Sequence, residues 1–339
     1  MRRALKLAEM GSGLVSPNPL VGAVIVGDHG ERLGEGFHRG PGTAHAEVAA
    51  LENAREAGHD PAGATLFVTL EPCCHVGRTG PCTEALIAAG ITRVVSAAGD
   101  PTAKVAGRGY AALIAAGIDV QQVDGAEAAA ARRQNQPFRI HATLGRPMVL
   151  LKQAMTLDGR VTVPGRRWLS DDQSRSLVHM WRAQVDGVAV GSGTALADDP
   201  QLTSRGPNPV HRQPRRVVFD RRLRTPPTAR MLGLDDGAET LVVTDPDAEP
   251  GARAALESAG ATILEADSLE TGLRLLGDRG LQSLLLEGGP TLAAAFSDAG
   301  LVDRVATFIT PLAGPDPVEN WFWQEVGHDM LVSGAVREV

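Results

Sequence analysis

The sequence predicts an α/β protein made of two successive domains, each with a sheet covered by helices. Short runs such as 20–26, which is apolar and β-branched, and 283–287, which contains three successive leucines, have the length and composition of buried strands. These runs alternate with segments of helical periodicity that end at glycine, an order that places helices on the faces of a sheet. The 339 residues are enough for two domains of ordinary size.

The boundary between the two domains is expected at residues 135–147. This stretch contains Pro137, Gly145 and Pro147 without clear periodicity, which is typical of an irregular link. The strand–helix alternation starts again after it. We therefore expect one domain over residues 1–144 and a second over 145–339.

The elements of the first domain are expected as follows, in chain order. They are a helix over 2–11 ended by Gly11, a strand over 20–26 paired with 33–37 as a hairpin, a helix over 44–57, a strand over 65–70, a helix over 82–89 with Pro81 at its start, a strand over 92–97, a helix over 108–116, a short strand, and a helix over 126–134.

The second domain is expected to continue in the same way. Strands are expected over 148–154, 186–191, 216–219, 240–244, 283–287 and 303–309, and helices over 171–182, 251–258, 268–276 and 290–299. We find no internal repeat and no low-complexity segment.

Composition and charge place the chain among globular enzymes. Hydrophobic residues make up 43% and charged residues 22% of the chain, and the net charge is −7. An acidic chain without clustered Lys and Arg argues against a nucleic-acid surface, because neutralising phosphates requires such clusters. The sequence has no secretory signal and no apolar stretch long enough to span a bilayer, so a cytoplasmic protein without a membrane partner is expected.

The most specific motif runs from His45 to Cys82. His45-Ala46-Glu47 is followed by a Pro-Cys pair at Cys73 and a second one at Cys82, the pattern of zinc-dependent nucleobase deaminases. His45, Cys73 and Cys82 would supply three ligands to one tetrahedral Zn²⁺ per chain and leave the fourth position for water. Separately, a His-x-Glu pair is often surface decoration and two cysteines are often buried apolar residues, but their order and the prolines favour the metal site.

Glu47 is the expected catalytic acid and base. Zinc lowers the pKa of its water and so provides hydroxide at neutral pH. Glu47 would take a proton from that water and pass it to the ring nitrogen and the departing ammonia. Cys74 is left over, either buried or facing the pocket. The three cysteines lie within ten positions, which does not suit a disulfide framework.

The first half resembles the deaminase domain of the RibD family of bifunctional riboflavin-biosynthesis deaminase/reductases. The resemblance lies in the insertion PCCHVGRTGPC at 72–82, in SPNPLVGAVIV at 16–26, and in Asp100-Pro101 followed by VAGRG at 105–109. It implies a cytidine-deaminase-like three-layer α/β/α domain. It also implies substrate contacts from Asn18, His75, Asp100 and Lys104.

The second half carries motifs that resemble the reductase domain of the same family. They are LKQAMTLDGR at 151–160, GSGTALADDPQLT at 191–203 followed by Arg205, and EGGPTL at 287–292. Alone, Gly-Gly-Pro after a strand is a weak signal for phosphate binding at a helix start, since glycines often simply end strands. The resemblance implies a dihydrofolate-reductase-like α/β domain that uses NADPH.

The roles of residues in the second half follow from this resemblance. Asp198 is the group expected nearest the chemistry, and it is also a cofactor contact. The further cofactor contacts implied are Ala154, Trp168, Thr194, Gly288, Gly289, Pro290, Thr291 and Leu292. The substrate contacts implied are Lys152, Arg182, Leu202, Arg205 and Glu287, of which the last four would hold the ribose phosphate.

Cofactor choice is expected to depend on the end of strand 216–219. An acid such as Asp220 at a strand end often favours the unphosphorylated ribose of NADH. Arg221 or Arg222, which follow it, would instead pair with a 2′-phosphate, as the family's use of NADPH implies. We take Arg221 as the cofactor contact.

The chain departs from the usual pattern of the family at several positions. Gly80 stands where Pro is usual, Thr102-Ala103 replace Asn-Pro, and Asp171 replaces Ser or Thr. The loop 164–167 before Trp168 is shorter, and Pro311–Pro315 departs from Pro-x-Leu-Leu-Gly-Gly.

The expected protein is therefore a bifunctional enzyme that acts on a phosphorylated pyrimidine. Its first half would deaminate 2,5-diamino-6-ribosylamino-4(3H)-pyrimidinone 5′-phosphate, and its second would reduce the ribosyl side chain to ribityl. Two alternatives stay open: a zinc deaminase for a free base or tRNA whose second half is a binding module, and a fusion whose reductase half is structural. The sequence leaves the oligomeric state open, a homo-oligomer included.

Overall fold

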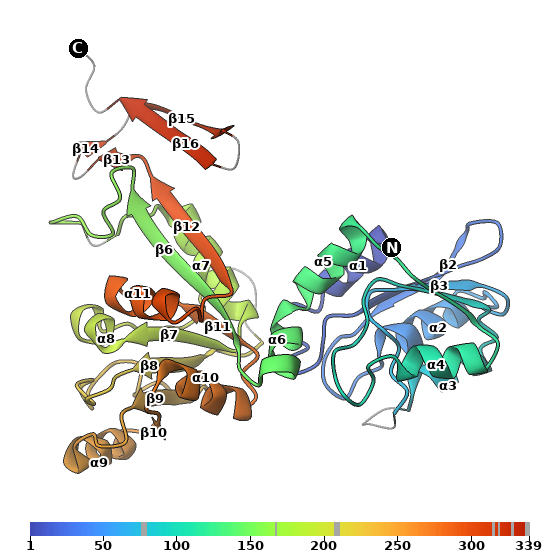
Figure 1. Cartoon of the computed structure of the whole chain (residues 1–339), viewed down its shortest axis with the longest axis horizontal. Helices are drawn as coiled ribbons and strands as arrows, with labels where there is room; N and C mark the ends of the chain where they lie inside the picture. The colour runs from blue at the N-terminus through green and yellow to red at the C-terminus, as the bar shows by residue number, and fades with distance from the viewer. Residues whose placement is uncertain are drawn as a thin grey trace. The chain divides into compact units, whose positions relative to one another are not determined.

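The computed structural model describes residues 1–75, 80–166, 168–206, 211–313, 316–317, 319–326 and 329–335. Residues 76–79 of the cysteine insertion, residue 167 and residues 314–315, all named above, lie outside these ranges. The chain divides into two compact units, residues 1–147 with 276–282 and residues 148–275 with 283–339. Each unit has its own main sheet (Figure 1).

The first unit is a mixed sheet with strand order β2-β1-β3-β4-β5. β1 pairs antiparallel with both β2 and β3, and β3, β4 and β5 run parallel. Its elements are α1 (Arg2–Glu9), β1 (Gly22–Val26), β2 (Arg32–Phe37), α2 (Ala46–Glu56), β3 (Thr65–Val68), α3 (Cys82–Ala88), β4 (Arg93–Ser96), α4 (Arg108–Ala115), β5 (Asp119–Gln122), α5 (Ala126–Gln134) and α6 (Gln136–Leu144).

Alternating side chains of β1 divide this unit into three layers. Ala23 and Ile25 are buried in a core with α2, α3 and α4 on one face of the sheet. Val24 points to the other face, where it packs against α1. Leu5 of α1 and Ala131 of α5 share a cluster on that face. The sheet therefore lies between two helical layers (Figure 1).

Two glycines of β2 allow α2 to lie directly on the sheet. A Cβ at Gly36 would lie 2.5 Å from the nitrogen of Ala50 and 2.7 Å from the carbonyl oxygen of Ala46, and one at Gly34 would lie 2.3 Å from the carbonyl oxygen of Ala50. Any larger residue would push the helix away. β2 thus fixes the distance between the sheet and α2, the helix whose N-cap is His45.

The second unit is built on a seven-stranded sheet with order β10-β9-β8-β7-β11-β6-β12. Its elements are β6 (Met148–Thr156), α7 (Asp172–Gln184), β7 (Gly187–Gly191), α8 (Ser192–Asp198), β8 (Arg215–Phe219), β9 (Thr240–Thr244), α9 (Pro250–Ser258), β10 (Ala261–Glu265), α10 (Leu269–Asp278), β11 (Ser283–Leu286), α11 (Pro290–Asp298), β12 (Arg304–Thr310), β13 (Leu312–Ala313), β14 (Asp316–Pro317), β15 (Glu319–Val326) and β16 (Asp329–Ala335).

All strand pairs of the seven-stranded sheet are parallel within the described residues. Val190 and Val218 are buried with α7 and α9 on one face. On the other, the ring of Phe219 meets that of Phe296 of α11 edge to face at 5.1 Å between centroids. Because the strands are parallel, their carboxyl ends meet along one edge, where α/β proteins usually bind ligands.

The expectation of an irregular link at 135–147 is wrong. Residues 136–144 form α6, with Asn135 at its N-cap and Pro137 within its first two positions. Proline is tolerated there because the first amides of a helix have no partner within the helix. Pro137 therefore begins a helix, and Gly145, with φ of 68°, ends it.

Several boundaries also differ from the expectation. α2 begins at Ala46, so His45 is its N-cap residue and not part of its first turn. Pro81 is the N-cap of α3 and Cys82 its first residue. Asp171, a departure from the family pattern, caps α7 by accepting a hydrogen bond from the nitrogen of Ser174 at 2.7 Å. An aspartate is as good an N-cap as serine or threonine.

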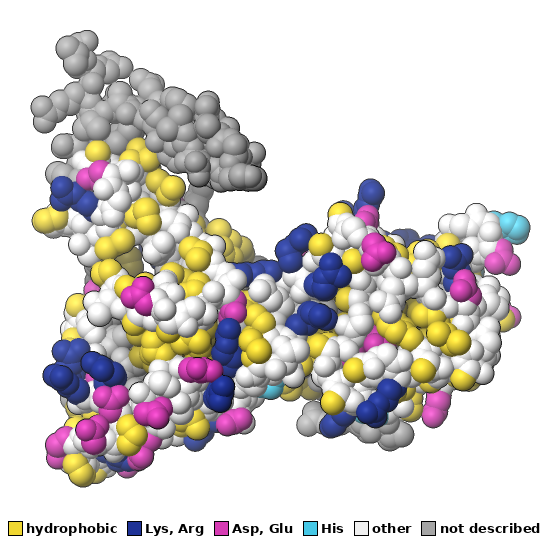
Figure 2. All heavy atoms as spheres, in the orientation of Figure 1, with side chains coloured by type: hydrophobic (Ala, Val, Ile, Leu, Met, Phe, Trp, Pro, Cys, Tyr) yellow, Lys and Arg dark blue, Asp and Glu magenta, His cyan; other side chains and the backbone are white. Residues whose placement is uncertain are grey.

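Some elements were not expected at all, namely α8, β10 and the strands β13 to β16. Within the described ranges, no helix combines the length and apolar character needed to cross a membrane. On the face shown in Figure 2, basic and acidic side chains are interspersed over both units.

Candidate functional sites

The structure brings His45, Cys73 and Cys82 together in the first unit. His45 precedes α2, Cys73 follows β3, and Cys82 begins α3. Nδ1 of His45 lies 3.2 Å from Sγ of Cys82 and 3.4 Å from Sγ of Cys73, and the ligand atoms of all three lie within 4.8 Å of one another. Three segments far apart in sequence thus converge on one point.

These separations fit a tetrahedral zinc ion. With Zn–S and Zn–N bonds of ordinary length, sulfur and nitrogen ligands of one tetrahedron are about 3.6 Å apart. The observed 3.2 and 3.4 Å are close to that value. Three protein ligands are also the number that catalytic zinc sites use, with a fourth position for a substrate or water.

The pKa shifts of Cys73 and Cys82 also indicate a site for a cation. The hydrogen bond from Cys82, followed by that of His45, lowers the pKa of Cys73 to about 4. The same bond and burial raise the pKa of Cys82. Two thiolates this close repel each other, so both lose their protons readily only with a cation between them. The donor set therefore suits a divalent, thiophilic metal.

Glu47 lies beside this group on the first turn of α2. Glu47 is 3% exposed. Burial, and then the negative charge of Cys73, raise the pKa of Glu47 to about 7. A carboxyl with this pKa can both accept and donate a proton near neutral pH, as a general acid–base catalyst must.

Asn18 is held by His38, a buried residue that the sequence analysis did not single out. Nδ2 of Asn18 lies 2.9 Å from Nε2 of His38, and Nδ1 of His38 lies 3.1 Å from the carbonyl oxygen of Ala44. Since that carbonyl only accepts, Nδ1 carries the proton and Nε2 accepts from Asn18. Burial lowers the pKa of His38, which keeps this ring neutral. The sequence signal that could have identified His38 was its position directly after the expected strand 33–37.

The loop after β4 carries Asp100 and Lys104. Oδ1 of Asp100 accepts hydrogen bonds from the nitrogen and the Oγ1 of Thr102, at 2.7 and 2.6 Å. Thr102, a departure from the family pattern, therefore stabilises the turn at Asp100. Sγ of Cys74 is 4.0 Å from the carbonyl oxygen of Lys104, so Cys74 contacts the loop and is not part of the metal group. His75 is exposed.

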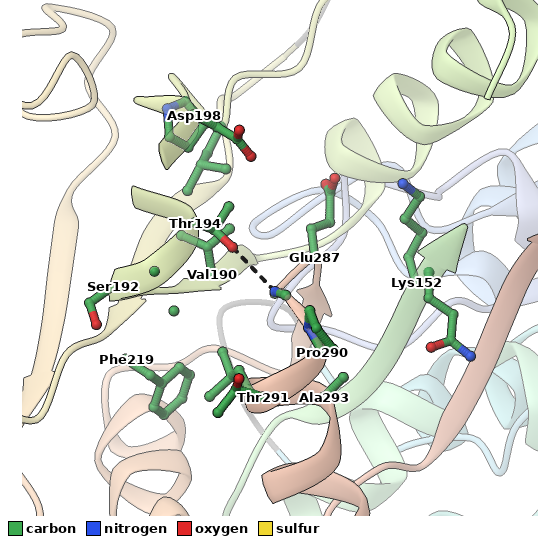
Figure 3. A pocket seen from close by; sticks show the side chains of 18 of the residues that line it. Lys152, Val190, Ser192, Thr194, Asp198, Phe219, Glu287, Pro290, Thr291 and Ala293 are labelled. Atoms are coloured by element: carbon green, nitrogen blue, oxygen red, sulfur yellow. Dashed lines mark hydrogen bonds between the residues drawn. The ribbon is translucent and has the colours of Figure 1, made fainter. Parts of the chain in front are cut away.

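A cavity of about 2140 Å³ in the second unit collects the residues expected there. It opens at the carboxyl ends of the parallel strands, and Figure 3 shows part of it. The expected residues that line it are Lys152, Ala154, Trp168, Arg182, Thr194, Asp198, Leu202, Arg205, Arg221, Glu287, Gly288, Gly289, Pro290, Thr291 and Leu292. Every residue assigned to the second half lies in this one pocket.

Arg182 and Glu287 form a bidentate ion pair at the wall of the pocket. Nε and Nη2 of Arg182 donate to the two carboxylate oxygens at 2.6 and 3.0 Å, and Nη1 donates to the carbonyl oxygen of Thr203 at 3.0 Å. The side chains are 14% and 11% exposed. Lys152 lies near this pair, and burial lowers its pKa.

The Gly-Gly-Pro turn is held against α8. Oγ1 of Thr194 accepts a hydrogen bond from the nitrogen of Gly289 at 3.2 Å (Figure 3). Gly289 is the N-cap of α11 and Pro290 its first residue. The start of this helix therefore borders the pocket, which Asp198 of α8 also lines.

Arg224 and Arg230 were not expected in the pocket, whereas Arg222 was already a candidate for pairing with the 2′-phosphate. Arg222, Arg224 and Arg230 line it beside Arg221. Nη2 of Arg224 donates to Oγ of Ser192 at 2.7 Å. The run of arginines directly after strand 216–219 was the sequence signal for this basic edge.

Two family models match the chain. The model of the RibD C-terminal domain matches residues 147–314, and that of the cytidine and deoxycytidylate deaminase zinc-binding region matches residues 1–98. RibD of Aquifex aeolicus is 40% identical over 313 residues, which cover 92% of this chain and 86% of that protein. RibD of Escherichia coli is 40% identical over 334 residues, covering 93% and 88%.

Solved structures agree with these matches. Acinetobacter baumannii RibD, form 1, has a TM-score of 0.82 at 35% identity and covers 99% of this chain and 98% of its own. The diaminohydroxyphosphoribosylaminopyrimidine deaminase/5-amino-6-(5-phosphoribosylamino)uracil reductase of Thermotoga maritima has a TM-score of 0.81 at 34% identity and covers 98% and 96%. The expected fold class is confirmed, a cytidine-deaminase-like domain followed by a dihydrofolate-reductase-like domain. The chain belongs to the RibD family and is a bifunctional enzyme of riboflavin biosynthesis, a deaminase and a reductase.

Proposed function

We propose that residues 1–144 are the deaminase domain and residues 145–339 the NADPH-dependent reductase domain. The first would hydrolyse the 2-amino group of 2,5-diamino-6-ribosylamino-4(3H)-pyrimidinone 5′-phosphate, and the second would reduce the ribosyl side chain of the product to ribityl. The two activities for which the Thermotoga relative is named support these substrates. The observation that carries the proposal is the group of His45, Cys73 and Cys82 with the buried Glu47 beside it.

In the deaminase domain, His45, Cys73 and Cys82 would hold one Zn²⁺. Zinc supplies Lewis acidity, which lowers the pKa of a water molecule to about 7. Glu47 takes a proton from the water as its oxygen adds to C2 of the pyrimidine. It delivers this proton to the ring nitrogen, then takes the remaining proton of the new C2 hydroxyl and delivers it to the amino group, which leaves as ammonia while the C2 carbonyl forms. Its pKa of about 7 suits both steps.

The substrate would be held by loops around this centre. Asn18 is fixed by His38, and Asp100 and Lys104 lie on one short loop whose turn Thr102 stabilises. We assign substrate contacts to these three residues and to His75. None of them is a metal ligand, so they would act on binding and orientation.

In the reductase domain, the cavity has room for two ligands. Its volume of about 2140 Å³ is about twice that of a large pocket for one small molecule. NADPH supplies the hydride. The start of α11 suits a cofactor phosphate, because the N-terminus of a helix binds anions. Thr194, Asp198 and the Gly288–Leu292 segment would contact the cofactor, together with Ala154 and Trp168. Arg221 would contact the 2′-phosphate.

The ribose phosphate would lie against Arg182, Leu202, Arg205 and Glu287, with Lys152 nearby. The amino group at C1 of the ribose allows the ring to open to an imine, and the hydride adds to that carbon. Asp198 is the group we assign nearest to this reaction. Two nitrogens of Arg182, Nε and Nη2, already donate to Glu287, whereas Nε of Arg205 donates to Oγ1 of Thr203. The guanidinium of Arg205 therefore has more donors left for the phosphate.

The deciding experiment is an assay of both steps on the purified full-length protein. Release of ammonia from the diamino substrate tests the first step, and NADPH oxidation that depends on the deaminated product tests the second. We expect both, with about one zinc per chain, as a single site with three protein ligands implies. Ammonia release without NADPH oxidation would restrict the proposal to the first domain.

A further inference from the structure

Glu71 is a buried carboxylate between the end of β3 and the metal ligand Cys73. Glu71 is 3% exposed. Oε2 accepts hydrogen bonds from the nitrogens of Asp100 and Gly107 at 3.2 and 3.0 Å. Oε1 accepts from the nitrogens of Gly109 and Tyr110 at 3.0 and 3.3 Å. A carboxylate has about four acceptor positions, so these four amides use its capacity.

The four amides belong to one segment that carries substrate contacts. Residues 100–110 begin at Asp100, include Lys104, and enter α4 at Arg108. Gly107, the N-cap of α4, has no side chain that could cap the helix, and Glu71 takes over that task from a distant position. Its negative charge is also favourable at a helix N-terminus. Both ends of the loop are thus fastened to the same side chain.

The contact between α4 and the metal-ligand turn is close. A Cβ at Gly109 would lie 2.1 Å from the carbonyl oxygen of Pro72 and 3.1 Å from Cγ of Glu71. Only glycine permits this approach. The nitrogen of Glu71 donates in turn to the carbonyl oxygen of Ala98 at 2.8 Å, so the strand end and the start of the loop are joined there as well.

We propose that Glu71 is a positioning residue of the deaminase. It fixes the distance between the turn that carries Cys73 and the loop that carries Asp100 and Lys104, and it does not contact the reacting atoms. This inference rests on the proposed function, because it takes Asp100 and Lys104 as substrate contacts. It adds a residue whose effect reaches the substrate through four backbone amides.

The test is Glu71→Gln in the full-length, zinc-loaded protein. Glutamine keeps the size but replaces one acceptor oxygen by an amino group, which then faces two backbone donors. We expect KM for the diamino substrate to rise by about tenfold or more, equal to about 1.4 kcal/mol of binding, with a smaller change in kcat. Zinc content and the reductase kinetics with deaminated substrate should stay at the level of the parent protein. An unchanged KM, or a loss of zinc that accounts for the lost activity, would overturn the inference.

Tyr110→Phe is the matched control. The Tyr110 hydroxyl is bonded to Oγ of Ser96 at 2.8 Å and donates to the carbonyl oxygen of Ala98 at 3.1 Å, so its removal weakens the same region and leaves the bonds of Glu71 intact. We expect a lower melting temperature and an unchanged KM. If Tyr110→Phe raised KM as much as Glu71→Gln, the effect would be general destabilisation and the inference would fail.

Two further variants complete the design. Gly109→Ala disrupts the same contact without changing the carboxylate, and it should raise KM in the same way. This variant keeps the inference testable if Glu71→Gln does not fold. An unchanged KM in Gly109→Ala counts against the inference. Asp100→Ala and Lys104→Ala separate it from the proposed function. If both leave KM unchanged, the proposed substrate contacts fail, and if they raise KM while Glu71→Gln does not, only the role of Glu71 fails.

Discussion

Asn135 binds both polar groups of the Leu20 backbone. Its Nδ2 donates to the carbonyl oxygen of Leu20 at 2.8 Å, and its Oδ1 accepts from the nitrogen of Leu20 at 2.7 Å. The side chain thereby acts like a neighbouring strand for one residue of the loop that carries Asn18. The junction of α5 and α6 therefore belongs structurally to the first unit.

Asn135→Ala should destabilise the first unit by about 1–3 kcal/mol, because it leaves the part-buried backbone donor and acceptor of Leu20 without this partner. Asn135 is 2% exposed, so water cannot easily replace its amide. Unfolding by denaturant, monitored through the loss of deaminase activity, would measure the effect. Arg132→Ala, on the exposed side of α5, is the control and should change stability by no more than about 0.5 kcal/mol. Equal stability of both variants would contradict the structural role of Asn135.

Cys82→Ser should lose zinc and deamination, whereas Cys74→Ser should keep both. Cys82 belongs to the group of three ligand atoms, and Cys74 faces the loop at Lys104. Metal analysis of the purified variants checks this directly. Metal lost from Cys74→Ser and kept in Cys73→Ser would show that the ligand assignment is wrong.

Glu47→Gln should keep zinc and lose deamination by roughly two to four powers of ten, the usual value of general acid–base catalysis. Glutamine has nearly the same size but cannot carry the proton. The same protein should still oxidise NADPH when supplied with deaminated substrate, because no proposed reductase residue lies in the first unit. Near-normal deamination in this variant would remove Glu47 from the mechanism.

Arg221→Ala should weaken the use of NADPH and leave the use of NADH nearly unchanged. We expect KM for NADPH to rise by about tenfold, since a guanidinium paired with a phosphate contributes on the order of 1–3 kcal/mol. Asp220, the acid that would favour NADH, is buried and accepts hydrogen bonds from the nitrogen and Oγ1 of Thr225, both at 2.7 Å. It is therefore tied within its own loop.

Arg222→Ala is the matched control for this prediction, because Arg222 also lines the pocket. A larger loss of NADPH use in Arg222→Ala would transfer the assignment to that residue. Equal use of both cofactors by the parent enzyme would refute the prediction as a whole.

Arg205→Ala should raise KM of the reductase for its substrate with little change in kcat, because a clamp on a remote phosphate contributes similarly to the ground and transition states. Asp198→Asn should instead lower kcat. Steady-state NADPH oxidation with deaminated substrate separates the two effects. Deamination should be unaffected in both variants, and an unchanged kcat in Asp198→Asn would remove Asp198 from the chemistry.

The sequence predicted well what depends on local pattern. The buried strands were recognisable because a run such as residues 20–26 contains only apolar residues and glycine. The group of His45, Cys73 and Cys82, which the structure brings together, was recognisable because the three residues stand in a motif. Both kinds of signal lie within a short stretch of chain.

Helices with proline or glycine in their first turn were missed. Pro137 suggested a break, although proline in the first turn costs a helix nothing, and Gly193 hid α8. Positioning residues were missed for a different reason. The partners of Glu71 lie at positions 100–110 and that of His38 at Asn18, so their roles exist only once the chain has folded.

The parallel sheet of the second unit also has a practical consequence. The pocket lies at the carboxyl ends of its strands, whereas the turn at Ala259–Gly260 enters β10 at the opposite, amino end and does not line the pocket. Gly260 is exposed there. This turn is therefore a place where a fluorescent protein can be inserted with the reductase site left whole.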